Sequence, residues 1–112
     1  MFEKNAIKEE LKDTLYKLLK EKGISIYKII IFGSFVKGKY KEDSDIDIII
    51  VSPDFRGKSI FERIKLVTGL GRELVKKFKK PFDLIYYSDE EWEKKNFMII
   101  NETKKHGEII YG

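Results

Sequence analysis

The sequence predicts an α/β (α+β) fold in which helices pack on a small mixed β-sheet. Three features support this prediction: an amphipathic N-terminal segment, three short β-branched runs, and two capping boxes that precede helical patterns. The chain has 112 residues, of which 42% are hydrophobic, which suits a single domain over 1–112 that buries a core without disulfides. The expected order of elements is α-β-β-α-β-α, with a short strand at the end.

The first helix is expected over residues 3–22, because apolar side chains recur there at helical spacing with Lys and Glu between them. These side chains are Ile7, Leu11, Leu15, Leu18 and Leu19. Gly23 directly follows the last turn and suits a C-cap, since glycine adopts the left-handed conformation at little cost. The run IYKIIIF at 26–32 is short, β-branched and ends at Gly33, which predicts a buried strand.

Two further strands are predicted beyond a loop at 33–44 that is rich in glycine, serine and charge. The run DIDIIIV at 45–51 makes the second strand, and Ser52-Pro53 ends it because proline cannot continue a ladder of hydrogen bonds. The third strand is FDLIYY at 82–87, and the closing residues EIIYG favour a short edge strand.

A capping box marks the start of the second helical segment, where Ser59 precedes Glu62 by three residues. The helix that follows is expected to present one apolar face to the sheet, made by Ile60, Ile64, Val67, Leu74 and Phe78. Gly69 and Gly71 interrupt this helix, and they either weaken its middle or allow a close approach to the sheet.

Ser88 and Glu91 form a second capping box, which begins a helix or helix pair that extends to about His106 and ends at Gly107. Three apolar side chains of this segment either cover the sheet or form a surface for a partner: Trp92, Phe97 and Met98. His106 is the only histidine, and its place near a helix end favours a surface role over catalysis.

Composition excludes several classes of site. The chain has no cysteine, so it forms neither disulfides nor thiolate metal sites. No apolar run approaches the roughly 20 residues that cross a bilayer, and the charged N-terminus is unlike a signal peptide, so we expect a cytoplasmic protein. The 23 basic and 19 acidic residues give a net charge of +4, which fits either an ordinary lysine-rich surface or one that attracts nucleotides or nucleic acid.

The chemistry of the chain is indicated by Gly33-Ser34, followed after ten residues by Asp45 and Asp47. Gly33 ends a strand at a sharp turn, where glycine lets the backbone approach a ligand closely, and the hydroxyl of Ser34 and nearby N–H groups suit phosphate oxygens. Asp45 and Asp47 are two residues apart on a strand, so both point to one face. Two such carboxylates tolerate their repulsion if a divalent cation lies between them, and magnesium shares its oxygen ligands with phosphates.

Asp83 supplies a third carboxylate. It interrupts an apolar strand, where it is costly without a partner. If this strand lies beside the second one, Asp83 completes an acidic cluster that can hold two metal ions. Each part also has an ordinary alternative: Asp-x-Asp as a solvated turn, Gly-Ser as loop chemistry, and Asp83 as a strand-end residue paired with lysine.

Together, Gly33-Ser34, the ten-residue spacer, Asp45-x-Asp47 and the distal Asp83 resemble the minimal nucleotidyltransferases of the DNA polymerase β superfamily. The resemblance implies a polymerase β-type nucleotidyltransferase fold and transfer of a nucleoside monophosphate from a nucleoside triphosphate, with release of pyrophosphate. It further implies that Gly33 and Ser34 grip the phosphates. Asp45 and Asp47 would bind both magnesium ions, and Asp83 would bind the catalytic one and help to activate the acceptor hydroxyl.

Short members with this spacing resemble the antitoxins of toxin–antitoxin pairs whose partner is an all-helical RNase with a HEPN domain. The resemblance therefore implies transfer of AMP to a tyrosine of that toxin, with Mg2+ as cofactor and ATP as donor. Many relatives carry arginine three residues after the serine, where this chain has Lys37; lysine can contact phosphate, but only as a point charge. A homo- or hetero-oligomer is compatible with such a partner.

Two other functions stay open. The acceptor could instead be a small molecule or an RNA end, although the added domains that such members carry are not visible in this sequence, so nucleic acid is not an expected partner. Alternatively, the protein neutralises its partner by binding alone, which the retention of Asp45, Asp47 and Asp83 argues against.

Overall fold

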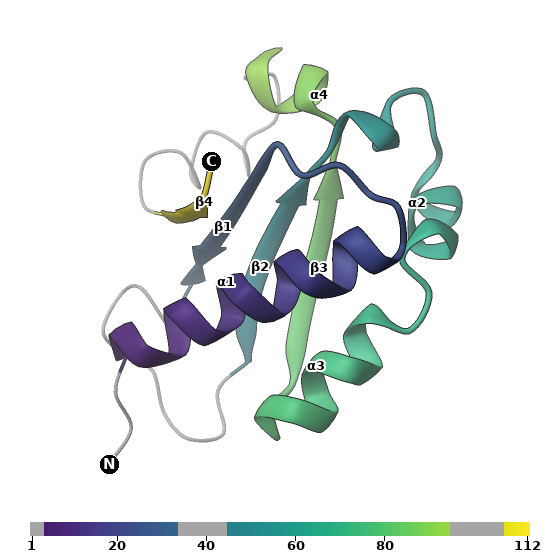
Figure 1. Ribbon diagram of the computed structural model, residues 1–112. Coiled ribbons are helices and arrows are strands. Elements are labelled where there is room, and N and C mark those ends of the chain that lie inside the picture. Colours follow the sequence, from purple (N-terminus) through teal and green to yellow (C-terminus); the bar gives the residue numbers. More distant parts are fainter. Residues whose placement is uncertain (1–3, 34–44, 95–106) are drawn as a thin grey trace.

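The computed structural model describes residues 4–33, 45–94 and 107–112, and its centre is a four-stranded mixed sheet (Figure 1). The strands are β1 (Lys28–Phe32), β2 (Ile46–Val51), β3 (Phe82–Tyr87) and β4 (Glu108–Tyr111). Their order across the sheet is β3-β2-β1-β4, in which β1 is antiparallel to both neighbours and β2 is parallel to β3. The predicted mixed sheet and the short final edge strand are thereby confirmed.

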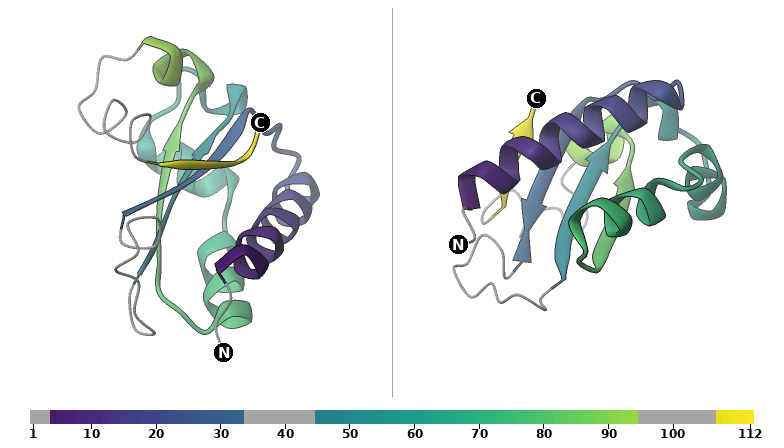
Figure 2. Two further views of the ribbon diagram at one scale, coloured as in Figure 1. Left: turned by 90° about the vertical axis from the view of Figure 1, so that its left-hand side faces the viewer. Right: turned by 60° about the horizontal axis from the view of Figure 1, so that its bottom comes forward.

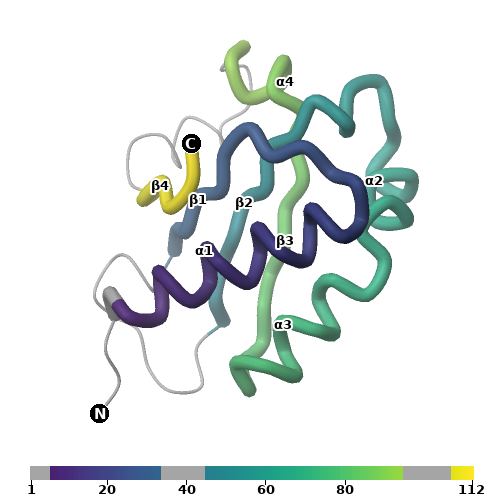
Figure 3. The backbone as a smooth tube through the Cα atoms, in the orientation of Figure 1, coloured from purple at the N-terminus to yellow at the C-terminus, as the bar shows by residue number. Residues whose placement is uncertain are grey.

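Within the described ranges, the sheet is accompanied by α1 (Lys4–Glu21), α2 (Ile60–Leu66), α3 (Leu70–Phe78) and α4 (Asp89–Lys94). A 3-10 turn, η2 (Pro53–Phe55), directly follows β2 after the predicted stop at Ser52. α1 crosses the strands diagonally and lies on the same face of the sheet as α3 (Figure 2, Figure 3). None of the described helices has the length and apolar character needed to span a membrane.

Alternation along the strands divides the core into two layers. The larger layer joins the first face to α1 and α3, and its main side chains are Leu11, Leu15, Leu19, Ile29, Ile31, Ile46, Ile48, Ile50, Leu70 and Leu74. The smaller layer, on the other face, consists of Ile30, Ile49, Val51 and Trp92. Neighbouring residues of a strand thus point to opposite faces, as a pleated strand requires, and the predicted inward direction of Ile46 and Ile48 is confirmed.

α1 ends at a glycine, as the sequence predicts. Gly23 has a φ of +75°, in the left-handed region where glycine is unstrained. Its N–H donates to the carbonyl oxygen of Lys20 at 3.0 Å, and the N–H of Ile24 donates to that of Leu19 at 2.9 Å. This pair of bonds is a Schellman motif, which satisfies carbonyl groups that the helix end would otherwise leave open.

Both predicted capping boxes are present. Before α2, the N–H of Glu62 donates to Ser59 Oγ at 3.2 Å, and the N–H of Ser59 donates to the Glu62 carboxylate at 2.8 Å. Before α4, Glu91 and Ser88 make the same exchange at 3.1 and 2.8 Å. Each box satisfies N–H groups that the first turn of a helix leaves unpaired.

Trp92 of α4 is 3% exposed and packs in the smaller core layer. Of the two roles that the sequence allowed for this side chain, the structure favours covering the sheet over binding a partner. The other predicted residues of this segment lie outside the described ranges: Phe97, Met98 and His106. The helix end that Gly107 was expected to cap lies outside them as well.

The prediction of one helix from Ser59 to Phe78 is wrong, because the chain forms two helices there. Gly69 separates them with a φ of +89°, a left-handed conformation that a continuous right-handed helix cannot contain. Gly71 causes no unusually close approach, since a Cβ at this position would lie 3.8 Å from Leu84 Cδ1. The break therefore comes from the backbone at Gly69.

The predicted burial of α2 is also wrong. Ile60 and Ile64 are 64% and 50% exposed, whereas Arg63 between them is only 8% exposed. Val67 and Leu74 are buried as expected. A break in the helix changes the rotation of the first segment relative to the second, so residues on the two sides cannot share one apolar stripe.

Candidate functional site

Asp47 and Asp83 lie side by side on neighbouring strands. β2 and β3 are parallel, and Asp47 is the register partner of Asp83, so the two residues lie about 4.8 Å apart across the sheet and point to the same face. Phe32, the last residue of β1, pairs with Asp47 on its other side. Alternation places all three on the face opposite α1. The proximity that the sequence left conditional is present in the structure.

Asp45 adds a third negative charge at this edge of the sheet. It is exposed and directly precedes β2, two residues before Asp47. Burial raises the pKa of Asp47, and the negative charges of Asp83 and Asp45 raise it further. The three carboxylates therefore share one electrostatic environment, in which a bound cation would relieve the repulsion among them.

Gly33 brings the backbone against the Asp47 carboxylate. Its φ is +79°, in the left-handed region that favours glycine. A Cβ at this position would overlap Asp47 Oδ2 and would lie 3.2 Å from Asp47 Cγ. A side chain at residue 33 would thus displace one of the candidate ligands, which gives a physical reason for glycine at this point of the motif.

The carboxylates suit a hard divalent cation. Within the described ranges, no salt bridge reaches Asp45, Asp47 or Asp83. In that same part of the chain, no three Asp, Glu, His or Cys side chains converge into a complete metal-binding group. Magnesium does not need one, because it keeps several waters and combines one or two carboxylates with substrate phosphates. The residues present therefore fit a magnesium ion whose ligands a nucleotide completes.

The remaining predicted residues, Ser34 and Lys37, lie outside the described ranges. Sequence reasoning missed Phe32, which is half-buried and flanks Asp47 at the end of β1. Its position directly before Gly33, at even spacing from Ile30, is the signal that could have placed it on this face. The site thus has an apolar neighbour on one side and a second carboxylate on the other.

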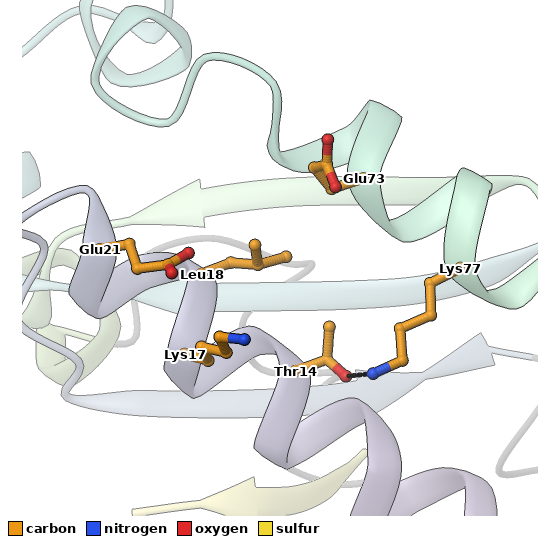
Figure 4. Close-up of a pocket in the computed structure, with 6 residues that line it drawn as sticks. All are labelled: Thr14, Lys17, Leu18, Glu21, Glu73 and Lys77. Carbon is orange, nitrogen blue, oxygen red and sulfur yellow. Dashed lines mark hydrogen bonds between the residues drawn. The ribbon is translucent and has the colours of Figure 1, made fainter.

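A separate cavity of about 300 Å³ lies between α1 and α3 (Figure 4). It is lined by Thr14, Lys17, Leu18, Glu21, Glu73 and Lys77. Lys77 Nζ donates to the Thr14 hydroxyl at 2.9 Å across it. Because α1 and α3 lie on the face opposite Asp47 and Asp83, this cavity is not part of the carboxylate site.

The sequence model of the family described as "Nucleotidyltransferase domain" matches residues 8–110. The chain belongs to this family. The matched range contains Gly33 and the three carboxylates at 45, 47 and 83. The protein is therefore a nucleotidyltransferase, as the resemblance of its motifs predicted.

Similar proteins agree with this assignment. A protein of Methanocaldococcus jannaschii named "Putative protein adenylyltransferase MJ0604" is 36% identical over 87 residues, which cover 77% of this chain and 79% of the relative. A solved structure of a toxin-antitoxin with AMP-PNP has a TM-score of 0.64 and 21% identity, and the match covers 89% of this chain and 72% of the other. A mutant of the toxin-antitoxin MntA-HpeT has a TM-score of 0.61 and 19% identity, over 99% and 74% of the two chains. The nucleotidyltransferase fold is thereby confirmed.

Proposed function

We propose that this nucleotidyltransferase depends on magnesium and transfers AMP from ATP to a tyrosine of a partner toxin with a HEPN domain, for which it is the antitoxin. The observation that carries the proposal is the register pair of Asp47 and Asp83, with the Gly33 backbone against it. Two adjacent carboxylates without an ion-pair partner in the described ranges need positive charge nearby, and a magnesium–nucleotide complex supplies it.

Each residue of the site has a role in this proposal. The Gly33-Ser34 turn would offer N–H groups and a hydroxyl to the phosphates, and Lys37 would add a positive charge. The three carboxylates would hold Mg2+, with two ions in the full site. Bound Mg2+ would neutralise charge on the phosphate oxygens and favour loss of the acceptor proton. The acceptor oxygen attacks the α-phosphorus, the bond to pyrophosphate breaks, and AMP remains on the acceptor.

The names of similar proteins support a protein acceptor and a toxin partner. The Methanocaldococcus jannaschii relative is named as a protein adenylyltransferase. The two structural neighbours described above are named as toxin-antitoxin structures, and one of them contains the nucleotide AMP-PNP. The other is a mutant in which two aspartates, two residues apart, are replaced by glutamate, the same spacing as Asp45 and Asp47 in this chain.

The test is to incubate the chain with labelled ATP, Mg2+ and a HEPN-domain protein as the candidate partner, and to locate the label by mass spectrometry. We expect AMP on a tyrosine of the partner. Asp47→Asn should lower the transfer rate by at least about 100-fold, because one ligand charge is lost. Asp13→Asn is the matched control, since Asp13 is an exposed carboxylate on α1, and it should transfer at the wild-type rate.

Other outcomes would redirect the proposal. Label on a small molecule or an RNA end, with none on the partner, would replace the proposed acceptor. If Asp47→Asn still neutralised the toxin fully, binding alone would be the mechanism of neutralisation. Equal transfer by Asp47→Asn and the wild type would exclude the carboxylate pair as the catalytic centre.

A further inference from the structure

α2 differs from an ordinary surface helix, because it exposes large apolar side chains and buries a charged one. Beside the exposed Glu62 and Lys65, it exposes three large apolar side chains by half or more: Phe61 is 75% exposed, Ile60 64% and Ile64 50%. Its buried side chain is the cationic Arg63, which is 8% exposed. Since each residue turns the helix by about 100°, Ile60, Phe61 and Ile64 fall within an arc of about 100°. We call these three residues the α2 patch.

The exposure of this patch does not come from a loosely attached helix. Ser59 and Glu62 form a complete capping box at the start of α2. Arg63 donates to the carbonyl oxygens of Lys58 at 3.0 Å and Tyr86 at 2.9 Å. The helix is therefore fixed with Arg63 inward, and the α2 patch is held toward solvent.

The patch is large enough to be the centre of an interface. A fully exposed Phe presents about 150–250 Å², so Phe61 alone exposes on the order of 150 Å² of apolar surface, and the exposed Ile60 and Ile64 extend this surface. Each partner of a stable protein interface buries roughly 800 Å², with an apolar centre and a polar rim. α2 lies at the periphery of the molecule, beyond the β3 side of the sheet (Figure 1, Figure 2), where a partner has access.

The charges beside the patch favour an acidic partner. Lys58 and Lys65 flank it, and neither makes a salt bridge in the part of the chain that the structure describes. The Glu62 carboxylate, which accepts the N–H of Ser59, lies within the electrostatic range of both lysines, so two positive charges meet one negative charge beside the patch. A second copy of the chain would bring the same two lysines against these, so self-association is disfavoured, whereas acidic side chains on a partner would pair with them.

We propose that the α2 patch is the docking surface for the partner toxin, and that it receives an apolar helix face of that protein flanked by acidic side chains. This inference rests on the proposed function, which supplies the partner. α2 contributes to the larger core layer through its C-terminal end at Val67, on the α1 face, whereas Asp47 lies on the other face. Docking and AMP transfer thus use separate residues, so they can be tested separately.

The test compares two substitutions with two matched controls. Phe61→Ser should raise the dissociation constant for the partner at least about tenfold in titration calorimetry. Val75→Ser, at an exposed apolar residue of α3, should leave this constant unchanged. Lys65→Glu should also weaken binding, and Lys76→Glu on α3 should not. All four side chains are exposed, so thermal melts should stay close to that of the wild type.

Failure of this inference can be told apart from failure of the proposed function. Asp47→Asn should bind the partner like the wild type and transfer AMP at least about 100-fold more slowly. If the wild type bound the partner without transferring AMP, and Phe61→Ser lost this binding, the proposed function would be wrong and the docking surface would stand. Wild-type affinity of Phe61→Ser would overturn the docking surface. The docking surface would also be overturned if the wild-type chain did not bind the partner, and if Phe61→Ser instead abolished self-association or binding to anionic vesicles.

Discussion

At the scale of single residues, the candidate site centres on a carboxylate whose ionised form is disfavoured by burial and by neighbouring negative charges. Asp47 is partly removed from water and lies beside the charges of Asp83 and Asp45. Such a group gains more from a cation than an isolated surface aspartate does, because binding removes repulsion as well as adding attraction. The unfavourable free energy of this carboxylate is offset by the buried core of the sheet around it, which includes its neighbours Ile46 and Ile48 on β2.

Gly33→Ala tests how closely the backbone and the carboxylate depend on each other. Gly33 and Gly57 both have left-handed φ values, +79° and +67°, but a Cβ meets Asp47 only at Gly33 and has nothing within 4 Å at Gly57. Alanine at either position should lower the free energy of unfolding by about 1 kcal/mol in urea denaturation. Only Gly33→Ala should also reduce the proposed AMP transfer, by at least about tenfold. A Gly33→Ala enzyme with wild-type activity would contradict this account.

The local parts of the site could be predicted from the sequence. A glycine after a buried strand and two aspartates at the start of the next are readable because each depends on near neighbours in the chain. The place of Asp83 beside Asp47 depends on strand order and register, which no local pattern contains. Arg63 gave no sequence signal of burial, because its partners come from two distant elements.

At the scale of elements, Arg63 connects α2 to β3 and α4. Its guanidinium donates to the Tyr86 carbonyl oxygen and, at 2.8 Å, to the Glu91 carboxylate. Glu91 also accepts the N–H of Ser88 in the capping box of α4. One buried cation thus links the start of α4 to the inner side of α2, which explains why α2 turns its arginine inward.

Arg63→Leu should lower the free energy of unfolding by roughly 2–3 kcal/mol, because it leaves a partly buried carboxylate without its cation and two carbonyl groups without the guanidinium donor. Arg72→Leu is the control, since Arg72 is exposed, and it should change stability by less than about 0.5 kcal/mol. Urea denaturation at neutral pH measures both values. Equal effects of the two substitutions would show that Arg63 is not the link between these elements.

The same pair makes this stability difference depend on pH. Burial acts to raise the pKa of Glu91, but hydrogen bonds from Arg63 and Ser88 and the charge of Arg63 leave it lower than its ordinary value of 4.5. A carboxyl group whose pKa is lowered in the folded state stabilises the fold at pH values above its ordinary pKa. This contribution is lost as the pH falls through the lowered pKa. The advantage of the wild type over Arg63→Leu should therefore be full at pH 7 and shrink below about pH 4.5.

The sequence predicts some elements better than others. Strands and capping boxes were recognisable, because each is specified by a few adjacent residues such as Ser88 and Glu91. The break at Gly69 was not predicted as a break, since one glycine in a helical pattern costs only about 1 kcal/mol and is often tolerated. Its left-handed φ of +89° is a consequence of how α2 and α3 each pack, which local periodicity does not specify.

At the scale of the whole molecule, one sheet serves two purposes. One face is covered by α1 and α3 and holds the larger core layer, whereas the other carries the smaller layer and the carboxylates. The parallel pairing of β2 with β3 brings Asp47 and Asp83 together, although α2 and α3 separate them in the sequence. The fold class was predictable from the alternation of patterns, but this parallel crossover, on which the candidate site depends, required the structure.

The most direct measurement is a crystal structure of the chain with Mn2+ and a non-hydrolysable ATP analogue, in which anomalous scattering locates the metal. We predict a peak within about 2.0–2.5 Å of carboxylate oxygens of Asp47 and Asp83 and of a phosphate oxygen. Manganese at carboxylates elsewhere, such as those of Glu21 and Glu73 in the cavity between α1 and α3, with none at Asp47, would contradict the account.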